Sequence, residues 1–525
     1  MKVLVRERIA DAGVELLRQR FHVDVDLNDD LLETIGEYDA IIVRSGTELR
    51  ADLIERAERL KVIGRAGVGI DNVDVAAASR RGIVVLNAPQ STVISAAEHT
   101  LGLLLALSRK IPQAHAALKA GRWERSAFAG IELAGKTLGL AGFGRIGQQV
   151  ARRGRGLEMR VLAYDPYVPP ERFRDLGVEP VASLEQLLAA SDFLSLHTTL
   201  TPETRGAIAR RELEAAKEGI RIVNVARGEL VDEEALVEAL RSGKVAGAAL
   251  DVFAHEPYSG PLLEFENVVV TPHLGASTHE AQDRAGVIVA EQVAAALEGG
   301  VVTNAVNMPA IGAEELEYLG PFLPLATKLG ALAVELAGGN PTRIDLTYLG
   351  QLAEHDTRLL TVAALNGAFQ GRVEQAVNYV NAPLVAGERG IEVREEASAA
   401  SPDFTSLVAV KAFSGEEAYA VAGTTIGSEH RARLVHALAY EIEVELDRFM
   451  LFAVNDDRPG MIGRLGTLLG EAGVNIANMA VSRNRQEARA LMALTLDSPI
   501  GNGLLERLRA EPGFVDARFL VLPDA

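Results

Sequence analysis

A glycine-rich segment and four polar residues, in a fixed order, are the part of this sequence best suited to chemistry. The segment Gly142–Gly147 follows an apolar run, and Asp165 ends the next such run. Arg227, Glu256 and His273 follow, each after a predicted strand. Glycines between a strand and a helix admit a pyrophosphate, and an acidic residue can accept ribose hydroxyls. An arginine can hold a carboxylate, and a histidine beside a glutamate can move a proton. This combination predicts hydride exchange between a nicotinamide and a 2-hydroxy acid.

Each glycine of the segment has its own expected part in holding a dinucleotide. Gly142 permits a tight turn, Gly144 lets backbone N–H groups approach the pyrophosphate, and Gly147 lets the helix pack on the strand. Asp165 is expected to accept the adenosine ribose hydroxyls and to repel a 2′-phosphate, which favours NAD over NADP. The alternative is that Asp165 and the proline after it only form a turn.

Arg227, Glu256 and His273 are expected to form the reacting part of the site. Arg227 lies in a glycine-bearing loop after a buried strand, where α/β folds place ligands, and a surface arginine beside a helix is the alternative. A lone histidine is more often structural, but Glu256 can orient the His273 imidazole and stabilise its protonated form. His255 is not assigned, because only one of two adjacent side chains can face the same cleft.

Alternating strand and helix patterns indicate how these residues are brought together. Short β-branched runs between Lys2 and Asn87 predict buried parallel strands separated by helices, and a second series begins at Thr137. A helix at Ser95–Ser108 leads into the second series, and a helix at about Thr278–Leu297 returns the chain to the first. We therefore expect a discontinuous substrate-binding domain at 1–94 and 280–307, an NAD-binding domain at 95–279, and a cleft between them.

The second half of the chain has a different pattern. Residues 301–310 have the composition of a linker, and 311–445 mix helices with strands as in an α+β domain. From Phe449 the order strand, helix, strand, strand, helix, strand predicts a ferredoxin-like unit at 449–525. The expected fold class is therefore α/β: a doubly wound Rossmann-type domain inserted in a flavodoxin-like domain, followed by the α+β and ferredoxin-like units.

The composition argues against several other classes of protein. The formal net charge of −19 disfavours a nucleic-acid or membrane partner, so local arginines must attract any anionic substrate. Cysteine is absent and the ten histidines show no metal-ligand spacing, so no metal site is expected. The most apolar run, Leu101–Leu107, is too short to cross a bilayer, and the first residues are typical of a strand rather than a signal peptide. A cytoplasmic location is expected.

Five further segments carry a resemblance to a known family. They are Val43–Ser45, Gly64–Asp74, Ser95–His99, Arg122–Arg125 and Pro272–Thr278. Together with the motifs above, they make residues 1 to about 307 similar to the D-isomer-specific 2-hydroxyacid dehydrogenases. The similarity is closest to the long-form members that oxidise 3-phosphoglycerate for L-serine synthesis. The resemblance implies NAD as cofactor and 3-phosphoglycerate as substrate.

The resemblance also implies roles for the matching residues. Arg227 would bind the substrate carboxylate, His273 would take the hydroxyl proton in oxidation, and Glu256 would orient His273. The residues implied around NAD are Gly142, Gly144, Arg145, Ile146, Gly147, Asp165, Thr198, Ala226, Asp251 and Gly275. Those implied around the substrate are Arg44, Ser45, Arg65, Val68 and Gly69, with Arg125 from a neighbouring subunit. Thr92 departs from the asparagine that is usual in the family.

The last two units resemble the regulatory half of the same long-form enzymes. Residues 311–445 are similar to the intervening domain, and 449–525 are similar to an ACT domain. The loop after the first strand of the ACT-like unit presents backbone N–H groups to a carboxylate, and Asp457 can bind an ammonium group. With Asn455 and Asn475, this loop is suited to a small amino acid, and the resemblance implies L-serine as feedback inhibitor. A domain that only dimerises is the alternative, and Asn455 replaces the aromatic residue or histidine frequent among relatives.

The substrate and the assembly each have alternatives at this point. A related dehydrogenase acting on 2-oxoglutarate, glycerate or lactate would use the same catalytic residues, although Arg44, Arg65 and Arg125 favour a phosphorylated substrate. A non-enzymatic NAD sensor could share the fold, although an intact catalytic set argues against it. The return helix and the Trp123 segment predict a dimer, and pairing of ACT domains predicts a tetramer.

Overall fold

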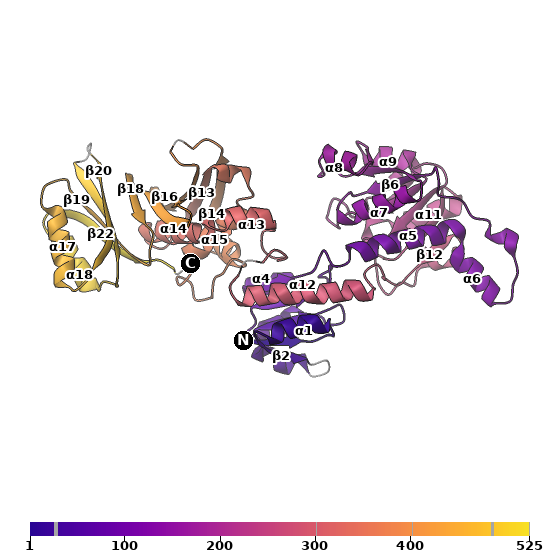
Figure 1. The fold of residues 1–525 in the computed structure, drawn as a ribbon, viewed down its shortest axis with the longest axis horizontal. Coiled ribbons are helices and arrows are strands. Elements are labelled where there is room, and N and C mark those ends of the chain that lie inside the picture. The colour runs from indigo at the N-terminus through magenta and orange to yellow at the C-terminus, as the bar shows by residue number, and fades with distance from the viewer. Residues whose placement is uncertain (26–29, 301, 402, 485–487, 524–525) are drawn as a thin grey trace.

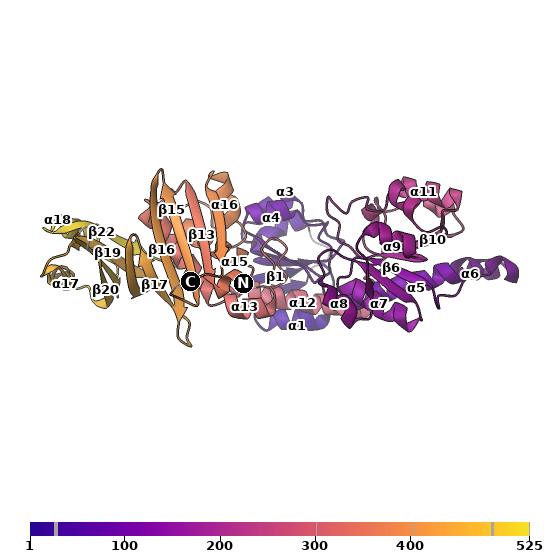
Figure 2. The same cartoon turned by 90° about the horizontal axis from the view of Figure 1, so that it is seen from above.

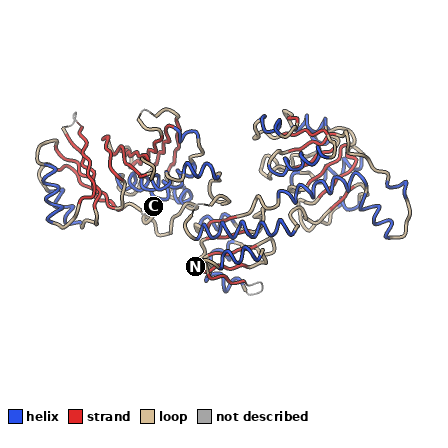
Figure 3. The backbone as a smooth tube through the Cα atoms, in the orientation of Figure 1, coloured by secondary structure: helices blue, strands red, loops and turns tan. Residues whose placement is uncertain are grey.

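The computed structural model describes residues 1–525 except 26–29, 301, 402, 485–487 and 524–525. Within the described residues the chain forms four β-sheets, each with its own helices. The corresponding bodies lie in a row, with the C-terminal sheet at one end and the second sheet at the other (Figures 1 and 2). The backbone trace in Figure 3 shows that helices cross between the first two bodies.

The first sheet is parallel, with the strand order β2-β1-β3-β4-β5. Its elements are β1 (Lys2–Val5), β2 (His22–Val25), β3 (Ala40–Val43), β4 (Val62–Arg65) and β5 (Val84–Leu86), with α1 (Asp11–Arg18), α3 (Ala51–Arg56) and α4 (Val75–Arg80). Val3 and Val5 join an apolar cluster with α1, whereas Leu4 joins a second cluster with α3 and α4. Because alternate residues of a strand point to opposite faces, helices bury the sheet on both sides. This strand order is flavodoxin-like.

The second sheet is also parallel, with the order β12-β11-β10-β9-β6-β7-β8. Its strands are β6 (Thr137–Ala141), β7 (Arg160–Tyr164), β8 (Glu179–Pro180), β9 (Phe193–Leu196), β10 (Ile220–Asn224), β11 (Val245–Leu250) and β12 (Val268–Val270). Its helices are α7 (Arg145–Gly156), α8 (Pro170–Asp175), α9 (Leu184–Ala190), α10 (Arg210–Ala215) and α11 (Glu233–Ser242). The order reverses between β6 and β9, and at such a switch point doubly wound folds bind dinucleotides.

Two long helices, α5 (Val93–Arg109) and α12 (His279–Leu297), connect these bodies. They meet at their N-terminal ends, where Ser95 Oγ lies 2.8 Å from Thr278 Oγ1. The Thr278 hydroxyl also caps α12 by accepting the Ala281 N–H at 3.1 Å. A Cβ at Gly13 would lie 2.8 Å from the Gly286 carbonyl oxygen, so α12 packs closely on α1. The helix that is late in the sequence therefore completes the first body.

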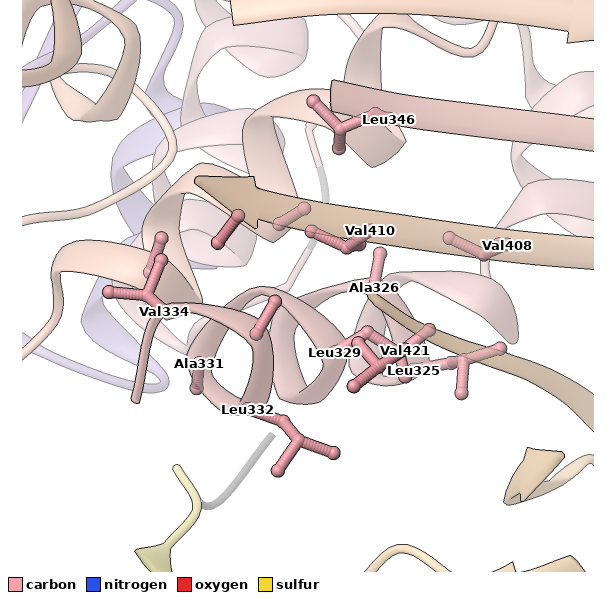
Figure 4. Close-up of a cluster of buried hydrophobic side chains, with 14 of the residues drawn as sticks. Leu325, Ala326, Leu329, Ala331, Leu332, Val334, Leu346, Val408, Val410 and Val421 are labelled. Carbon is pink, nitrogen blue, oxygen red and sulfur yellow. The ribbon is translucent and has the colours of Figure 1, made fainter. Parts of the chain in front are cut away.

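The third sheet has the order β14-β13-β15-β16-β17-β18, and its pairs are antiparallel except β13 with β14. Its strands are β13 (Arg343–Gly350), β14 (Glu392–Ser398), β15 (Ser406–Ser414), β16 (Glu417–Ile426), β17 (Arg431–Ala437) and β18 (Tyr440–Glu445). One face packs on α14 (Phe322–Leu336) and on α15 (Arg358–Phe369), where Tyr348 Oη of β13 lies 2.7 Å from Thr361 Oγ1 of α15. Figure 4 shows Leu325 and Leu329 of α14 beside Val410 and Val421 of the sheet. This face forms the largest apolar cluster among the described residues.

The fourth sheet is antiparallel, with the order β20-β21-β19-β22 that a ferredoxin-like unit requires. Its elements are β19 (Phe449–Asp456), α17 (Met461–Glu471), β20 (Ile476–Asn484), β21 (Arg489–Leu496), α18 (Asn502–Ala510) and β22 (Phe514–Val521). Leu451 and Ala453 pack with Met461 of α17, whereas Met450 and Phe452 join the core of the third body. The outer face of this sheet is therefore shared with its neighbour.

These strand orders confirm the fold class predicted from the sequence, whereas the exact domain boundaries stay predictions. Strands β8, β14, β17 and β18 were not predicted. The remaining short elements are α2 (Leu31–Thr34), η1 (Ile35–Glu37), α6 (Ile111–Lys119), η2 (Arg125–Phe128), η3 (Gly228–Leu230), η4 (Pro261–Glu264), α13 (Ala313–Leu319), η5 (Gln351–Glu354) and α16 (Ala382–Glu388). No helix in the described part of the chain is long and apolar enough to cross a membrane.

Candidate active site

The glycine segment forms the turn between β6 and α7. Gly142 has φ +96°, which favours glycine, and a Cβ there would lie 2.7 Å from the His197 carbonyl oxygen. A Cβ at Gly147 would lie 2.5 Å from the Gly142 carbonyl oxygen, so the helix packs closely on the turn. A Cβ at Gly144 would meet nothing within 4 Å, so the space at the α7 N-terminus is open. An open helix N-terminus carries partial positive charge, so these residues fit the pyrophosphate of NAD.

Asp165 follows β7 and lies beside this turn. Its Oδ2 accepts the Phe143 N–H at 2.8 Å, and its Oδ1 accepts the Tyr167 N–H at 3.0 Å. An ionised carboxylate has about four acceptor positions, so two backbone bonds leave room for ribose hydroxyls. The donor and acceptor chemistry of Asp165 therefore also fits NAD.

His197 and Thr198 follow β9 and lie on the other side of the glycine turn. The Thr198 nitrogen is 2.9 Å from the position that a Cβ at Gly142 would take. Ser195 Oγ lies 2.9 Å from His197 Nε2. Burial lowers the pKa of His197 to about 4, so its imidazole is neutral near pH 7. Thr198 was assigned a role from the sequence, whereas His197, which packs against the turn, was not.

His273 and Glu256 are in direct contact after the neighbouring strands β12 and β11. His273 Nδ1 lies 2.8 Å from Glu256 Oε2, and Glu256 Oε1 accepts the Phe253 N–H at 3.1 Å. The His273 side chain is 50% exposed and that of Glu256 is 37% exposed. Because Nδ1 faces the glutamate, Nε2 is the ring nitrogen left to exchange a proton with a substrate. His255, to which the sequence assigned no role, is exposed.

The loop that carries His273 is held by the buried carboxylate of Asp251. Asp251 is 0% exposed, and its two oxygens accept the backbone N–H groups of Leu274 and Gly275, both at 2.7 Å. Thr271 Oγ1 donates to it at 2.5 Å, and His99 Nε2 lies 3.1 Å from the same oxygen. Burial opposes ionisation, but these donors outweigh it and hold the pKa of Asp251 below its usual range. We call these five residues the Asp251 network.

From the sequence, Asp251 was expected to lie beside NAD. Because its carboxylate already accepts the bonds described above, its evident structural effect is to shape the Leu274–Gly275 backbone. Its carbonyl oxygen also accepts the His273 N–H at 2.9 Å. A Cβ at Gly275 would lie 2.8 Å from Val225 Cγ1 and 3.2 Å from Asp251 Oδ2, so the loop passes close to the end of β10.

Arg227 follows β10 and reaches toward the first body. Its Nη1 donates to the Ala226 carbonyl at 2.8 Å, and Asn224 Nδ2 donates to the Arg227 carbonyl at the same distance. The other guanidinium nitrogen, Nη2, lies 3.5 Å from the position that a Cβ at Gly69 would take. The guanidinium of Arg227 in the second body therefore lies close to the Val68–Gly69 segment of the first body.

Arg65 and Arg44 place further positive charge beside Arg227. The Arg65 side chain folds over Gly67, where a Cβ would lie 1.6 Å from Arg65 Nη1. Burial lowers the pKa of Arg65, and the nearby charges of Arg44 and Arg227 lower it further, against the opposing effect of Asp71. Arg65 Nε is buried without a hydrogen-bond partner among the described residues. Three guanidinium groups thus share one region of an acidic protein.

The loop that carries Arg44 and Ser45 is supported by Glu7, which sequence reasoning did not identify. Glu7 Oε1 accepts the N–H groups of Arg44 at 2.8 Å and Thr47 at 2.9 Å, and Oε2 accepts that of Gly46 at 3.1 Å. Ser45 is exposed on this loop. A glutamate just after the first strand gives no local sequence signal for such a long-range contact.

Arg125 lies apart from this cluster within one chain. It begins the short helix η2, beyond α6, and is exposed. Figure 1 shows α6 projecting from the second body, away from the first. Thr92, the departure from the family pattern, is 7% exposed at the N-cap of α5 and its side chain makes no capping bond.

A pocket of about 540 Å³ opens beside His273 and Glu256. Apolar side chains dominate its lining, including Phe253, Tyr258 and Leu263. The rings of Phe253 and Tyr258 stack with centroids 4.2 Å apart. These aromatic residues were not assigned from the sequence, because isolated aromatics in a loop are indistinguishable from ordinary core residues.

The three residues assigned to an effector make separate contacts in the fourth body. Asn455 is 2% exposed, and its Oδ1 lacks a hydrogen-bond partner among the described residues. Asp457 Oδ1 lies 3.3 Å from Arg483 Nε, and Asn475 Nδ2 donates to Asp497 Oδ2 at 2.6 Å. The described part of the chain thus shows no polar contact between any two of the three assigned side chains.

Comparison with known proteins agrees with this geometry. Residues 101–275 match the family described as D-isomer specific 2-hydroxyacid dehydrogenase, NAD binding domain. Residues 318–437 match the D-3-phosphoglycerate dehydrogenase intervening domain, and 449–513 match the ACT domain. The fold and the site therefore define an NAD-binding oxidoreductase that acts on a CH–OH group.

Relatives match along almost the whole chain. D-3-phosphoglycerate dehydrogenase of Methanocaldococcus jannaschii is 42% identical over 99% of this chain and 100% of its own length. The enzyme of the same name from Mycobacterium tuberculosis is 44% identical over 99% of each chain. The crystal structure of the TT0316 protein from Thermus thermophilus is similar over 58% of this chain and 100% of that chain, with 38% identity and a TM-score of 0.53. The chain therefore belongs to the D-isomer specific 2-hydroxyacid dehydrogenases, in their D-3-phosphoglycerate dehydrogenase branch.

Proposed function

We propose that this protein oxidises 3-phosphoglycerate to 3-phosphohydroxypyruvate with NAD, the first step of L-serine biosynthesis. The observation that carries the proposal is the 2.8 Å contact between His273 Nδ1 and Glu256 Oε2, which follow β12 and β11, beside the strand β10 that Arg227 follows. A general acid/base with a carboxylate partner and a nearby guanidinium are the groups that oxidation of a 2-hydroxy acid requires.

The residues of the chain divide the reaction between them. NAD supplies a hydride acceptor when bound at the glycine turn. His273 Nε2 takes the proton of the substrate hydroxyl, and Glu256 stabilises the imidazolium that forms. Arg227 holds the substrate carboxylate through paired hydrogen bonds, which fixes the carbon that loses the hydride. In the reverse direction His273 returns the proton.

Arginines beside this site account for selectivity toward a phosphorylated acid. Arg44 and Arg65 lie in the first body, and the charge of Arg65 interacts with those of both Arg44 and Arg227. Ser45, Val68 and Gly69 belong to the same two loops, where hydroxyl and backbone N–H groups supply further donors to a phosphate. Because the chain carries a net charge of −19, a substrate with phosphate and carboxylate groups needs this local cluster.

A comparison of substrates tests the proposal. The purified protein is assayed for NADH consumption with 3-phosphohydroxypyruvate, 2-oxoglutarate and pyruvate at matched concentrations. Preference for the phosphorylated acid is expected. Turnover of only the unphosphorylated acids would remove the phosphate role of Arg44 and Arg65, and NAD binding without any turnover would favour a sensor.

We propose further that the protein works as a homo-oligomer. Helix α6 and the segment after it expose Ile111 at 53%, Leu118 at 57% and Trp123 at 77%. An exposed apolar surface on a projecting element is typical of a subunit contact. In such an oligomer, Arg125 of one subunit would reach the substrate site of another. A cytoplasmic location stays a prediction.

We propose L-serine as the effector of the ACT domain. The carboxylate of a bound amino acid would accept backbone N–H groups at the start of α17, and Asp457 would hold the ammonium group. The partnerless Asn455 Oδ1 supports the presence of a polar ligand here. Calorimetry with L-serine on the wild type and on Asn475→Ala tests the assignment. Weaker binding by the variant is expected, and equal binding by both, or none by the wild type, would contradict it.

A further inference from the structure

His99 lies on the long helix α5 and belongs to the Asp251 network, although the reaction proposed above gives it no role. Its Nε2 is 3.1 Å from Asp251 Oδ1 and 3.0 Å from Thr271 Oγ1. The His99 side chain is 24% exposed and that of Asp251 is 1% exposed. Through His99, the helix that joins the two bodies is therefore in direct contact with a buried carboxylate of the second.

Asp251 connects His99 to the backbone of the loop that carries His273. The carboxylate that meets His99 also accepts the N–H groups of Leu274 and Gly275, directly after His273. His273 has φ +56°, an uncommon conformation for a residue other than glycine. A backbone in this conformation persists only when its surroundings hold it there. The hydrogen bonds to Asp251 provide such support.

The same face of α5 also holds the far end of this loop. Ser95 precedes His99 by one helical turn, so the two side chains lie on one side of the helix. Ser95 Oγ contacts Thr278 Oγ1 at 2.8 Å, where α12 begins. The loop from His273 to Thr278 is thus attached to α5 at both ends, through Asp251 at one and through Thr278 at the other.

We propose that His99 is a positioning residue for the dehydrogenase reaction: by holding Asp251 from the helix that joins the two bodies, it fixes the loop that presents His273 to Glu256 and to the substrate. The inference rests on the proposed function, because it concerns the orientation of the proposed acid/base. A displacement of a catalytic group by about 1 Å can lower a rate by about a hundredfold. A residue that acts only through position therefore has a measurable effect on turnover.

The test uses the full-length protein and compares His99→Ala with His99→Gln. Alanine removes the contact, whereas the glutamine side-chain nitrogen can replace imidazole Nε2 as a donor to Asp251. His99→Ala is expected to lower kcat about tenfold to hundredfold. The KM for 3-phosphoglycerate should change much less than kcat, since the contacts of His99 are to Asp251 and Thr271 and not to Arg227. His99→Gln should recover most of the lost kcat.

The pH–rate profile distinguishes a positioning role of His99 from a purely structural role, because a loss of stability alone would not shift the profile. If the loop shifts, the contact between His273 and Glu256 weakens, so the acidic limb of the profile should move to lower pH in His99→Ala. Glu98→Gln serves as the matched control, because Glu98 is the neighbouring residue and pairs with Arg153 on the exposed side of α5. This control should keep the wild-type kcat and profile.

The outcomes separate this inference from the proposed function. If His273→Ala abolishes turnover while His99→Ala keeps the wild-type kcat and pH profile, the positioning role is wrong and the function stands. If His273→Ala turns over normally, the proposed site itself is wrong. Equal loss of kcat in His99→Ala and His99→Gln, with an unmoved pH profile and a lowered melting temperature, would overturn the inference in favour of a structural role.

Discussion

Individual carboxylates and imidazoles in this protein have separate tasks because their surroundings differ. Asp251 is buried and surrounded by donors, so it remains ionised as a structural acceptor. Glu256 is partly exposed and has one oxygen directed at His273, so it can respond to the protonation of the imidazole. Asp165 faces the open end of α7 with acceptor capacity left. In the proposed function, carboxylates thus support a loop through Asp251, the base through Glu256 and the cofactor site through Asp165.

The carboxylate of Asp165 leads to a prediction about cofactor choice. Replacing Asp165 with serine should raise activity with NADP relative to NAD by about tenfold, because a nearby negative charge no longer repels the 2′-phosphate; tenfold corresponds to about 1.4 kcal/mol. The measurement is kcat/KM with both cofactors. Glu171→Gln, a change of one acidic residue on the exposed helix α8, is the control for net charge. An unmoved NAD to NADP ratio in Asp165→Ser would count against the assignment.

His197 leads to a prediction about stability at acidic pH. Because burial lowers its pKa from 6.5 to about 4, the unfolded chain binds a proton in this range that the folded chain does not. Stability should therefore fall as the pH decreases from about 6.5 to about 4, by no more than about 3 kcal/mol, since a pKa difference of one is worth about 1.4 kcal/mol. Urea unfolding at both pH values should show a smaller loss for His197→Asn than for the wild type. If the unfolding free energies of the wild type and of His197→Asn fall by the same amount between the two pH values, His197 takes up its proton while the protein is folded, and the prediction is wrong.

At the scale of elements, the strand and helix that flank the glycine turn show how packing creates a binding surface. Gly147 allows α7 to approach the turn, whereas Gly144 leaves the α7 N-terminus open. The two glycines therefore have different physical reasons for lacking a side chain, and substitution by alanine separates them.

The expected effects of the two alanine variants differ in kind. Gly147→Ala should lower the unfolding free energy by about 1–3 kcal/mol, because its Cβ would overlap the Gly142 carbonyl. Gly144→Ala should leave the melting temperature near that of the wild type but weaken NAD binding, because its Cβ would enter the open space at the helix end. Thermal unfolding and NAD titration measure both effects. Equal NAD affinity in Gly144→Ala and the wild type would contradict the cofactor position.

The sequence predicted the buried elements better than the exposed ones. Apolar runs such as those at Ala40–Val43 and Thr137–Ala141 form strands as predicted, because parallel strands are buried on both faces. Strand β14 was missed, because six of its seven residues are exposed and four are charged, and because it pairs with β13, which is distant in sequence. The contact between His273 and Glu256 followed from strand ends that meet at one sheet edge. The contacts of Glu7 with the Arg44 loop and of His99 with Asp251 could not be predicted, because the partners are distant in sequence.

At the scale of the whole molecule, a catalytic pair of bodies is followed by two bodies that lie away from the site (Figure 2). The fourth sheet shares an apolar cluster with the third, and Asn378 Nδ2 donates to the Gly82 carbonyl of the first body at 2.6 Å. Packed elements thus connect the fourth body to the first, and we propose that an effector of the ACT domain would act on the site through them.

The fluorescence of Trp123, the single tryptophan of the chain, can test whether subunits associate through its segment. Trp123 is 77% exposed in one subunit, so a subunit contact through its segment should bury the indole. Dilution should then shift the fluorescence maximum to longer wavelength as the molecular mass from light scattering falls. Leu118→Asp should give the exposed-indole spectrum at all concentrations. An oligomer whose spectrum stays that of an exposed indole would place the contact elsewhere.

The pH–rate profile of 3-phosphoglycerate oxidation, measured for the wild type, His273→Ala and Glu256→Gln, tests the central claim most directly. We predict a loss of about a hundredfold to ten-thousandfold in His273→Ala, as for removal of one general acid/base. In Glu256→Gln the acidic limb should move to lower pH, because the protonated imidazole loses its carboxylate partner. Near-normal turnover in His273→Ala, or an acidic limb unmoved in Glu256→Gln, would contradict the proposed mechanism.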